Sequence, residues 1–168
     1  IHSVEDYIMA RYQMYWQVYY HPVARSYETV FIQLFKRLND IFKVNKDYFS
    51  DIKVLVPFLE KSEVTVEEYF RLDENLLLYC CTLIQEKDDK IAADLADRLL
   101  NRKLFEYVDY NEDNLEQIKN MLKENNFDMN YYLRIESIEA SLYSPYKGRK
   151  ILIEKLDGKI VALEKAST

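Results

Sequence analysis

The sequence predicts an α+β fold, with a mainly helical front half followed by a small, mainly antiparallel sheet with a helix. Two glycines and three prolines in 168 residues are few, which favours long helices with short connections. Apolar residues recur every three to four positions through much of the front half, as on one face of a helix. Near the end, an Asp-Gly pair between two apolar runs is a strong hairpin signal. We therefore expect a helical part over residues 1–103 and an α+β subdomain over residues 104–168.

Two helices are expected at the start of the chain. The first runs over about residues 4–20, and Pro22 then begins a new helix or kinks a continuing one. From residue 23 to residue 42 the apolar side chains keep a period of three to four, which predicts a long amphipathic helix. Residues 45–50 break the pattern, and residues 52–59 form a short apolar helix of ambiguous type.

Capping residues mark the helix starts that follow, because a side-chain oxygen can accept a hydrogen bond from an unpaired N–H of the first turn. These signals are Thr65 with Glu68, opening a turn through Phe70; Asp73, before a helix over residues 74–85; and Asp88 or Asp89, before a helix over residues 90–100. The helix over residues 74–85 is apolar almost all round, so we expect it to be buried.

The tail of the chain changes its pattern from helical spacing to alternation. Strands are expected where short runs alternate or are rich in aromatic and β-branched residues, and one amphipathic helix lies among them. The expected strands are residues 104–110, 131–138, 150–156 and 159–163, the last two joined at Asp157-Gly158, and the helix covers residues 113–125.

The net charge, the two cysteines and the lengths of the apolar runs weigh against a nucleic-acid-binding protein and a membrane-spanning one. The net charge is −6 and no basic tail is present, which weighs against non-specific nucleic-acid binding. Cys80 and Cys81 are adjacent within an apolar run and point in different directions on a helix, so they are expected to be buried thiols of a cytoplasmic protein. No apolar run reaches about 18 residues, so no membrane span is expected.

The first helix carries a row of residues suited to an anionic ring compound. Arg11, Tyr15 and Tyr19 are spaced by four, which places them on one face. Arginine supplies a planar cation with a fork of donors, and tyrosine supplies a flat apolar ring with a hydroxyl tip. An anion attached to a ring, as in a nucleotide, would match this row. The alternative is a core helix with tyrosine tips at the surface and an arginine bound to a carboxylate.

Two stretches resemble the HD-domain deoxynucleoside triphosphate triphosphohydrolases, a family that includes bacterial dNTPases and a human restriction factor with a sterile-alpha-motif domain. The first stretch has the pattern R-x-x-M-Y-x-Q-V-Y-x-H, carried by Arg11, Met14, Tyr15, Gln17, Val18, Tyr19 and His21. The second has Glu68-Tyr69, Leu72, Asp73 and Asn75, followed by RLLNRKLFEYV over residues 98–108. Both occur in the family's order, and they imply that residues 1–103 complete an HD-type domain.

The resemblance implies roles for single residues. Arg11 matches an arginine that touches the substrate triphosphate, and Tyr19 matches a tyrosine lying against the deoxyribose. Tyr15 stands near the phosphates, where some relatives have histidine. His21 and Arg102 match a regulatory nucleotide site of the human relative. Alternatively, His21 is a locally bonded residue at a helix N-terminus, and Arg102 is a cation favoured by a helix C-terminus.

The resemblance also implies a divalent metal, held by a histidine, an adjacent His-Asp pair and a later aspartate. His2 and His21 are the chain's histidines, and neither precedes an aspartate. We therefore expect no metal ligand and no catalytic residue in this segment, which would be a fragment whose metal-binding half lies upstream.

The expected partners are a deoxynucleoside triphosphate and further copies of the chain, a homotetramer by resemblance, with no membrane and no specific nucleic acid. Two other functions stay open. One is a non-catalytic helical protein-interaction module, and the other is an HD phosphohydrolase of another nucleotide or phosphate ester. An upstream set of His, His-Asp and Asp would favour hydrolysis.

Overall fold

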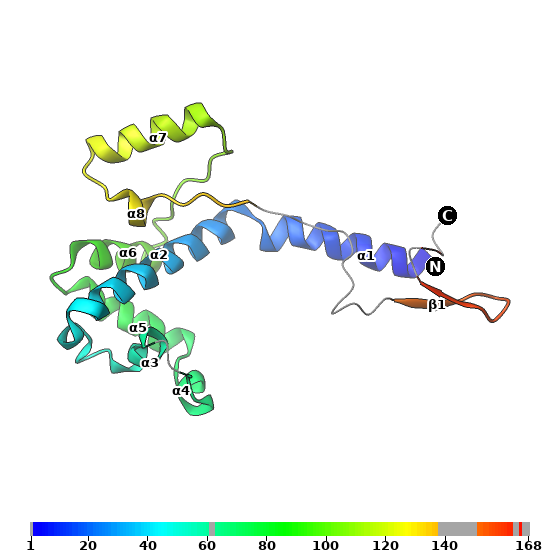
Figure 1. The fold of residues 1–168 in the computed structure, drawn as a ribbon, viewed down its shortest axis with the longest axis horizontal. Coiled ribbons are helices and arrows are strands. Elements are labelled where there is room, and N and C mark those ends of the chain that lie inside the picture. Colours follow the sequence, from blue (N-terminus) through cyan, green and yellow to red (C-terminus); the bar gives the residue numbers. More distant parts are fainter. Residues whose placement is uncertain (1, 61–62, 138–150, 163–164, 166–168) are drawn as a thin grey trace. The chain divides into compact units, whose positions relative to one another are not determined.

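The computed structural model describes residues 2–60, 63–137, 151–162 and 165 (Figure 1). The chain divides into two compact units, Ile1–His21 with Glu136–Thr168, and Pro22–Ile135. The predicted α+β fold, mainly helical with a small antiparallel sheet, is confirmed. The boundary expected between residues 103 and 104 lies inside the second unit, and that division stays a prediction.

The first unit begins with helix α1 (His2–Met14), which continues as one π-helical turn, η1 (Tyr15–Tyr19). In this turn the Tyr20 N–H donates to the Tyr15 carbonyl oxygen at 2.8 Å, an i→i+5 bond in place of the usual i→i+4 bond. The predicted helix over residues 4–20 is confirmed in position, but its wide last turn was not predicted. No residue from Ser3 to Tyr20 is buried.

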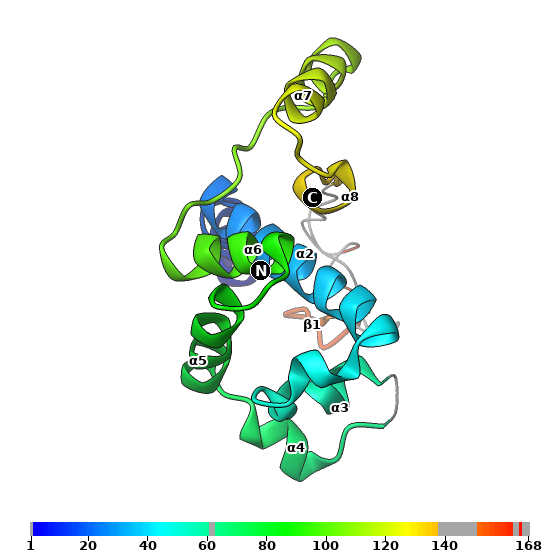
Figure 2. The ribbon, with the colours of Figure 1, turned by 90° about the vertical axis from the view of Figure 1, so that its left-hand side faces the viewer.

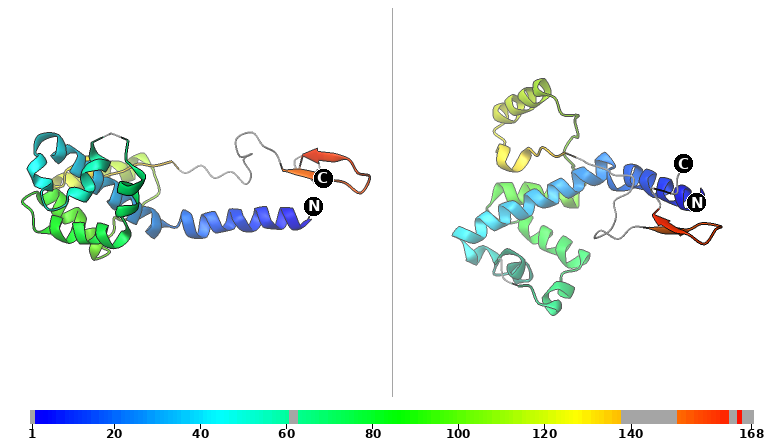
Figure 3. Two further views of the ribbon diagram at one scale, coloured as in Figure 1. Left: turned by 90° about the horizontal axis from the view of Figure 1, so that it is seen from below. Right: turned by 45° about the vertical axis from the view of Figure 1, so that its right-hand side comes forward.

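The first unit also holds the hairpin of β1 (Leu152–Glu154) and β2 (Ile160–Ala162), whose antiparallel arrows Figure 3 shows. Ile153 is the register partner of Val161. Gly158 has φ 79°, a left-handed conformation that glycine adopts without steric cost, and its N–H donates to the Lys155 carbonyl oxygen at 2.8 Å. The predicted hairpin at Asp157-Gly158 is confirmed. Residues 150 and 163 of the expected strands lie outside the described residues.

The second unit is built around α2 (Pro22–Val44). Pro22 is its first residue, where a missing N–H costs nothing. Val30, Leu34 and Leu38 form a stripe at intervals of four and are fully buried. Burying a side chain of this size contributes roughly 1.5–3 kcal/mol, so this stripe anchors the unit. The predicted long amphipathic helix is confirmed.

Two helices pack with α2 to form the core: α5 (Glu74–Gln85) and α6 (Lys90–Leu100). Their predicted starts are confirmed, because Asp73 Oδ1 accepts from the Leu76 N–H at 2.8 Å and Asp89 Oδ1 from the Ala92 N–H at 2.9 Å. Figure 2 shows α2 and α6 between the α7–α8 pair on one side and α3, α4 and α5 on the other. The buried residues of α6 are Ala92, Leu95, Ala96 and Leu99.

The expectation that the helix over residues 74–85 is buried holds for one face only. In α5 only Cys80, Cys81 and Ile84 are buried, and the Tyr79 side chain is 59% exposed. The reason is that α5 packs against α6 along one face, so its other apolar residues stay partly open to solvent.

Shorter elements connect α2 to α5. They are the 3₁₀ turns η2 (Lys46–Phe49) and η3 (Lys53–Leu55), and the helices α3 (Val56–Leu59) and α4 (Val66–Arg71). The predicted capping box is confirmed: the Glu68 N–H donates to Thr65 Oγ1 at 3.2 Å, and the Thr65 N–H donates to Glu68 Oε2 at 2.9 Å.

The part of the second unit after α6 contains α7 (Glu112–Glu124) and α8 (Met129–Tyr132). The helix expected over residues 113–125 is confirmed as α7. The strand predicted over residues 104–110 is wrong, since this stretch has no regular structure. Its apolar start packs on the core instead, and the Phe105 carbonyl oxygen accepts from Ser26 Oγ at 2.5 Å.

The strand predicted over residues 131–138 is also wrong for the described residues 131–137. Tyr131 and Tyr132 end α8, and residues 133–137 have no regular structure, while residue 138 lies outside the described residues. Tyr131 is buried in the core and hydrogen-bonds to two side chains of α2, which holds the local chain in a helical turn. Over the described ranges, none of the helices combines the length and hydrophobicity needed to cross a bilayer.

Candidate functional site

The Arg11 guanidinium lies on the surface of α1 and is held by the next residue of its row. Arg11 Nη2 donates to Tyr15 Oη at 3.3 Å, and Arg11 Cζ lies 5.6 Å from the centroid of the Tyr15 ring. The hydrogen bond to Tyr15 raises the pKa of Arg11, so the side chain stays cationic at every physiological pH. The side chain is exposed, so its other N–H donors are available to an anion.

The second ring of the row lies directly against the first. The Tyr15 and Tyr19 ring centroids are 5.0 Å apart at an interplanar angle of 40°, within the range of favourable aromatic pairs. The Tyr19 side chain is 54% exposed. The Arg11 cation, the Tyr15 hydroxyl and the open Tyr19 ring therefore follow one another along one side of α1 and η1; Arg11 and Tyr19 are exposed, and Tyr15 is partly buried.

A second aromatic row runs beside the first and was missed by the sequence reasoning. Tyr12 and Trp16 have ring centroids 6.1 Å apart, and Trp16 and Tyr20 have centroids 5.6 Å apart. The Tyr20 ring also lies 6.0 Å from that of Tyr15, because the π turn brings a residue five positions on to the same side. No spacing rule for α-helices pairs residues five apart, and the i→i+5 bond alone accounts for this contact.

The two residues assigned to a regulatory site belong to different units. His21 is exposed in the first unit, and its N–H donates to the Val18 carbonyl oxygen at 3.4 Å. Arg102 is exposed in the second unit and has φ 52°, and it directly follows Asn101, the C-cap residue of α6. The Lys103 N–H donates to the Arg98 carbonyl oxygen at 3.0 Å, which closes the end of α6. The structure thus gives Arg102 a backbone role at a helix end, and the regulatory site stays a prediction.

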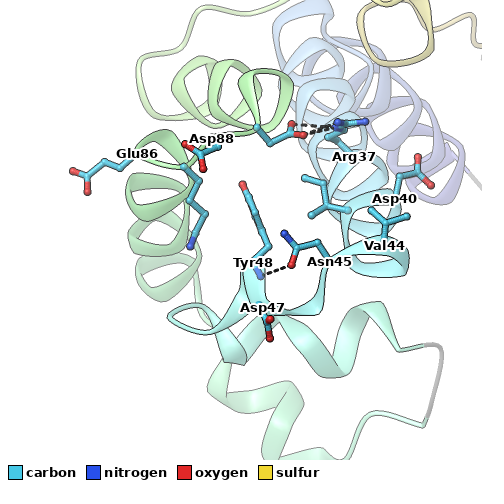
Figure 4. Close-up of a pocket in the computed structure, with 11 residues that line it drawn as sticks. Arg37, Asp40, Val44, Asn45, Asp47, Tyr48, Glu86 and Asp88 are labelled. Carbon is cyan, nitrogen blue, oxygen red and sulfur yellow. Dashed lines mark hydrogen bonds and ion pairs between the residues drawn. The ribbon is translucent and has the colours of Figure 1, made fainter.

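The second unit contains a hollow of about 720 Å³ between the C-terminal end of α2, η2 and the turn from α5 to α6. Figure 4 shows Arg37, Tyr48 and Asp88 arranged around it. The carboxylates that line it are Asp40, Asp47, Glu86, Asp88 and Asp89. Its two cations already form ion pairs, Arg37 with Asp89 and Lys87 with Asp51. A hollow with this excess of negative charge would repel a triphosphate, so it does not qualify as the substrate site.

A network of polar side chains at this hollow ties three helices together. The Arg37 guanidinium makes a two-pronged contact with Asp89, with Nη2 and Oδ2 at 2.5 Å and Nε and Oδ1 at 3.1 Å. Arg37 Nη1 also donates to Tyr131 Oη at 3.2 Å, and Tyr131 Oη donates to Asp40 Oδ2 at 3.0 Å. The hydrogen bond to Asp89 raises the pKa of Arg37. The network fixes the start of α6 and the end of α8 on α2, and it is structural.

The described residues do not supply a metal site. Among them, no group of three or more His, Cys, Asp or Glu side chains is arranged to hold a metal ion. The two cysteines are buried, and burial raises the pKa of the Cys81 thiol to about 11, which disfavours the thiolate that a metal requires. The donor set of an HD-type metal centre does not fit these residues.

Comparison with known proteins gives one sequence relative and one solved structure of direct interest. YwfO of Bacillus subtilis (strain 168), an uncharacterized protein, is 36% identical over 152 residues, which cover 88% of this chain and 35% of YwfO. A phosphohydrolase of Bacteroides thetaiotaomicron VPI-5482 has a similar fold, with a TM-score of 0.72 and 23% identity over 99% of this chain and 45% of that protein. No protein-family model matches the sequence. The chain thus spans about a third of YwfO and less than half of the phosphohydrolase, and it has the fold of part of a phosphohydrolase.

Proposed function

We propose that the chain is part of an HD-domain, metal-dependent phosphohydrolase that converts a dNTP into a deoxynucleoside and triphosphate. In this proposal α1 and η1 form one wall of the substrate site, and Arg11, Tyr15 and Tyr19 contact the nucleotide. The observation that carries the proposal is the exposed Arg11 guanidinium, held on Tyr15 beside an open Tyr19 ring. The fold shared with a phosphohydrolase supports the reaction class.

The chemistry of the row matches the parts of a dNTP in order. A guanidinium binds phosphate oxygens through two parallel hydrogen bonds and stabilises charge that develops when a phosphate ester is cleaved. The Tyr19 ring offers an apolar surface to a deoxyribose, and a ring packed on C2′ would exclude a ribose hydroxyl. The divalent metal of the reaction would be held by residues of a longer protein that includes this chain.

Nucleotide binding tests the proposal on the chain itself. Isothermal titration with dATP should show binding that weakens about tenfold or more in Arg11→Gln, because a hydrogen bond to a charged group is worth about 1.5–3 kcal/mol. Tyr19→Ala should reduce the preference for dATP over ATP. Arg71→Gln, which removes an exposed arginine from α4, is the matched control and should bind dATP normally. Equal affinities of the Arg11→Gln variant and the unchanged chain would refute the substrate assignment.

Turnover provides an independent test. The chain alone, incubated with dNTP and Mg²⁺ or Mn²⁺, should release no triphosphate, since its described residues lack a metal ligand set. In a longer protein that includes the metal site, Arg11→Ala should abolish turnover while the fold is kept. A near-normal rate in that variant would contradict the proposal.

A second candidate function, a non-catalytic protein-interaction module, is favoured by exposed apolar side chains on α4. Val66, Tyr69 and Phe70 are 66%, 65% and 77% exposed, respectively. Aromatic residues are enriched at protein interfaces. If this candidate is right, Phe70→Ser reduces self-association in sedimentation velocity runs, and Arg11→Gln changes nothing. Self-association by itself would also fit the homotetramer that the family resemblance implies, so the unchanged behaviour of Arg11→Gln in nucleotide binding is what favours this candidate.

A further inference from the structure

The π turn of η1 changes which rings surround Tyr15. In a regular α-helix, residues three and four apart share a face, so Tyr15 would meet Tyr19 but not Tyr20. Here the Tyr20 N–H bonds to the Tyr15 carbonyl oxygen at 2.8 Å, and both rings contact that of Tyr15. The centroid distances are 5.0 Å to Tyr19 and 6.0 Å to Tyr20, at interplanar angles of 40° and 41°. Tyr15 is therefore flanked by two rings.

The flanked ring holds the guanidinium of the proposed phosphate-binding arginine. Tyr15 Oη accepts from Arg11 Nη2 at 3.3 Å, and Arg11 Cζ lies over the Tyr15 ring at 5.6 Å. Arg11 itself is exposed, and within the described part of the chain its side chain interacts with tyrosines and forms no ion pair with a carboxylate. An exposed arginine without such support samples many rotamers, and binding an anion would have to immobilise it.

We propose that Tyr20 is a positioning residue, which acts through Tyr15 to preset the Arg11 guanidinium for an anionic ligand. The inference rests on the proposed function, because it assigns Arg11 to phosphate binding. The π turn is the device that recruits Tyr20, since the contact between residues 15 and 20 depends on the i→i+5 geometry. π turns of a single turn's length occur often at functional sites, where they reposition side chains.

The expected change in anion affinity follows from the rotamer freedom that Arg11 has already lost before the anion binds. Immobilising one side chain with many rotamers costs about 0.5–1.5 kcal/mol, so losing the preset position should weaken anion binding about two- to twelvefold. The ring of Tyr20, rather than its hydroxyl, makes the contact. Tyr20→Phe should therefore keep the affinity for the anion, and Tyr20→Leu should weaken it by this factor.

A double-mutant cycle with inorganic tripolyphosphate tests the inference on the whole chain. Tripolyphosphate has no ring, so its affinity measures the Arg11 contact without a contribution from base or sugar. Tyr20→Leu should weaken its binding two- to twelvefold in the unchanged background and not at all in the Arg11→Gln background. Tyr12→Leu is the matched control, because Tyr12 contacts Trp16 and should leave the affinity unchanged.

A second readout separates positioning from a general loss of structure. The NMR order parameter of the Arg11 Nε–H bond should fall in Tyr20→Leu and stay in Tyr20→Phe, and a merely structural role predicts no difference specific to Arg11. The far-UV circular dichroism of both variants shows whether the helix persists. If Tyr20→Leu unfolds the helix, Tyr20→Phe decides the matter. Affinity lost in Tyr20→Phe would overturn the inference.

The outcomes distinguish the two proposals. If Arg11→Gln leaves tripolyphosphate binding unchanged, the proposed function fails, and the inference fails with it. If Arg11→Gln weakens binding but Tyr20→Leu does not, or if Tyr12→Leu weakens it equally, the positioning role of Tyr20 is wrong and the proposed function stands.

Discussion

Replacing Asp89 should destabilise the second unit by an amount that can be divided between two roles. Its carboxylate caps α6 by accepting from the Ala92 N–H, and the same carboxylate pairs with the Arg37 guanidinium on α2. Asp89→Asn keeps an efficient N-cap and removes the charge, whereas Asp89→Ala removes both. Comparing the two substitutions therefore separates the cap from the ion pair.

The expected magnitudes follow from the geometry. Hydrogen bonds to charged groups contribute about 1.5–3 kcal/mol, and the side chains of Arg37 and Asp89 are 26% and 17% exposed, so solvent screening reduces both ends of this range. We expect Asp89→Asn to cost about 1–2 kcal/mol. A lost N-cap costs about 1 kcal/mol more, which brings Asp89→Ala to about 2–3 kcal/mol.

Urea unfolding followed by circular dichroism measures both free-energy changes. The matched control is Lys103→Gln, which breaks an exposed ion pair with Asp97 at the other end of α6 and should cost less than about 1 kcal/mol. Free energies of unfolding for Asp89→Asn and Asp89→Ala that match the control would refute the assigned roles.

The pH dependence of Asp89 has a definite sign. Burial alone would raise its pKa, but hydrogen bonds from Arg37 and from the Ala92 N–H outweigh burial and lower the pKa below the usual 3.8. A carboxyl whose pKa is lowered by folding stabilises the folded state above its unfolded pKa. The contribution of Asp89 is therefore complete above about pH 5 and is lost as the pH falls through the folded pKa. The difference in free energy of unfolding between the unchanged chain and Asp89→Asn should therefore shrink as the pH is lowered below about 5, which urea unfolding at several pH values measures.

Three further substitutions or reagents test other parts of the structure. Arg102→Gly should raise the free energy of unfolding by about 0.5–1 kcal/mol, because glycine adopts φ 52° without steric cost; lower stability in urea unfolding would contradict this account of the end of α6. Thr65→Ala should cost about 1 kcal/mol locally and speed hydrogen exchange of the first N–H groups of α4; unchanged exchange would show that the capping box is dispensable. Cys80 and Cys81 should react with a thiol reagent only after unfolding, because both are buried and burial raises the thiol pKa, that of Cys81 to about 11; rapid reaction of the folded chain would refute their burial.

Helix starts and the hairpin were predictable because their signals are local. The side chains of Thr65, Asp73 and Asp89 each accept from the N–H group three residues along the chain, so the capping residue itself defines the start. Gly158 likewise supplies a left-handed turn whatever the rest of the chain does. The buried stripe of α2 follows from a period of three to four.

The wrong strands show where local reasoning fails. Residues 104–110 alternate as a strand would, but a strand needs a partner that alternation does not specify. In the described structure Phe105 packs on the core and its carbonyl oxygen bonds to Ser26, which lies 79 residues earlier. The pairing of Arg37 with Asp89, 52 residues apart, was equally beyond a reading of neighbouring residues.

In the candidate site, too, some contacts were predictable from the spacing of residues and one was not. The four-residue spacing predicted that Arg11, Tyr15 and Tyr19 share a face, and their contacts are those expected of such a row. The contact between Tyr15 and Tyr20 depends on the π turn. The sequence contains no signal that predicts this turn, since Pro22 indicates only where the next helix begins. The assignment of these residues to a nucleotide stays a prediction until binding is measured.

The lack of any buried residue from Ser3 to Tyr20 has a thermodynamic consequence for ligand binding. Single helices of this length are marginally stable in water when tertiary packing does not support them. An anion that engages Arg11 only when α1 is helical would shift the helix–coil balance by mass action, and part of its intrinsic affinity would be spent on ordering the segment. The helix content of the N-terminal segment would then rise with occupancy, so that the segment reports its own ligation state.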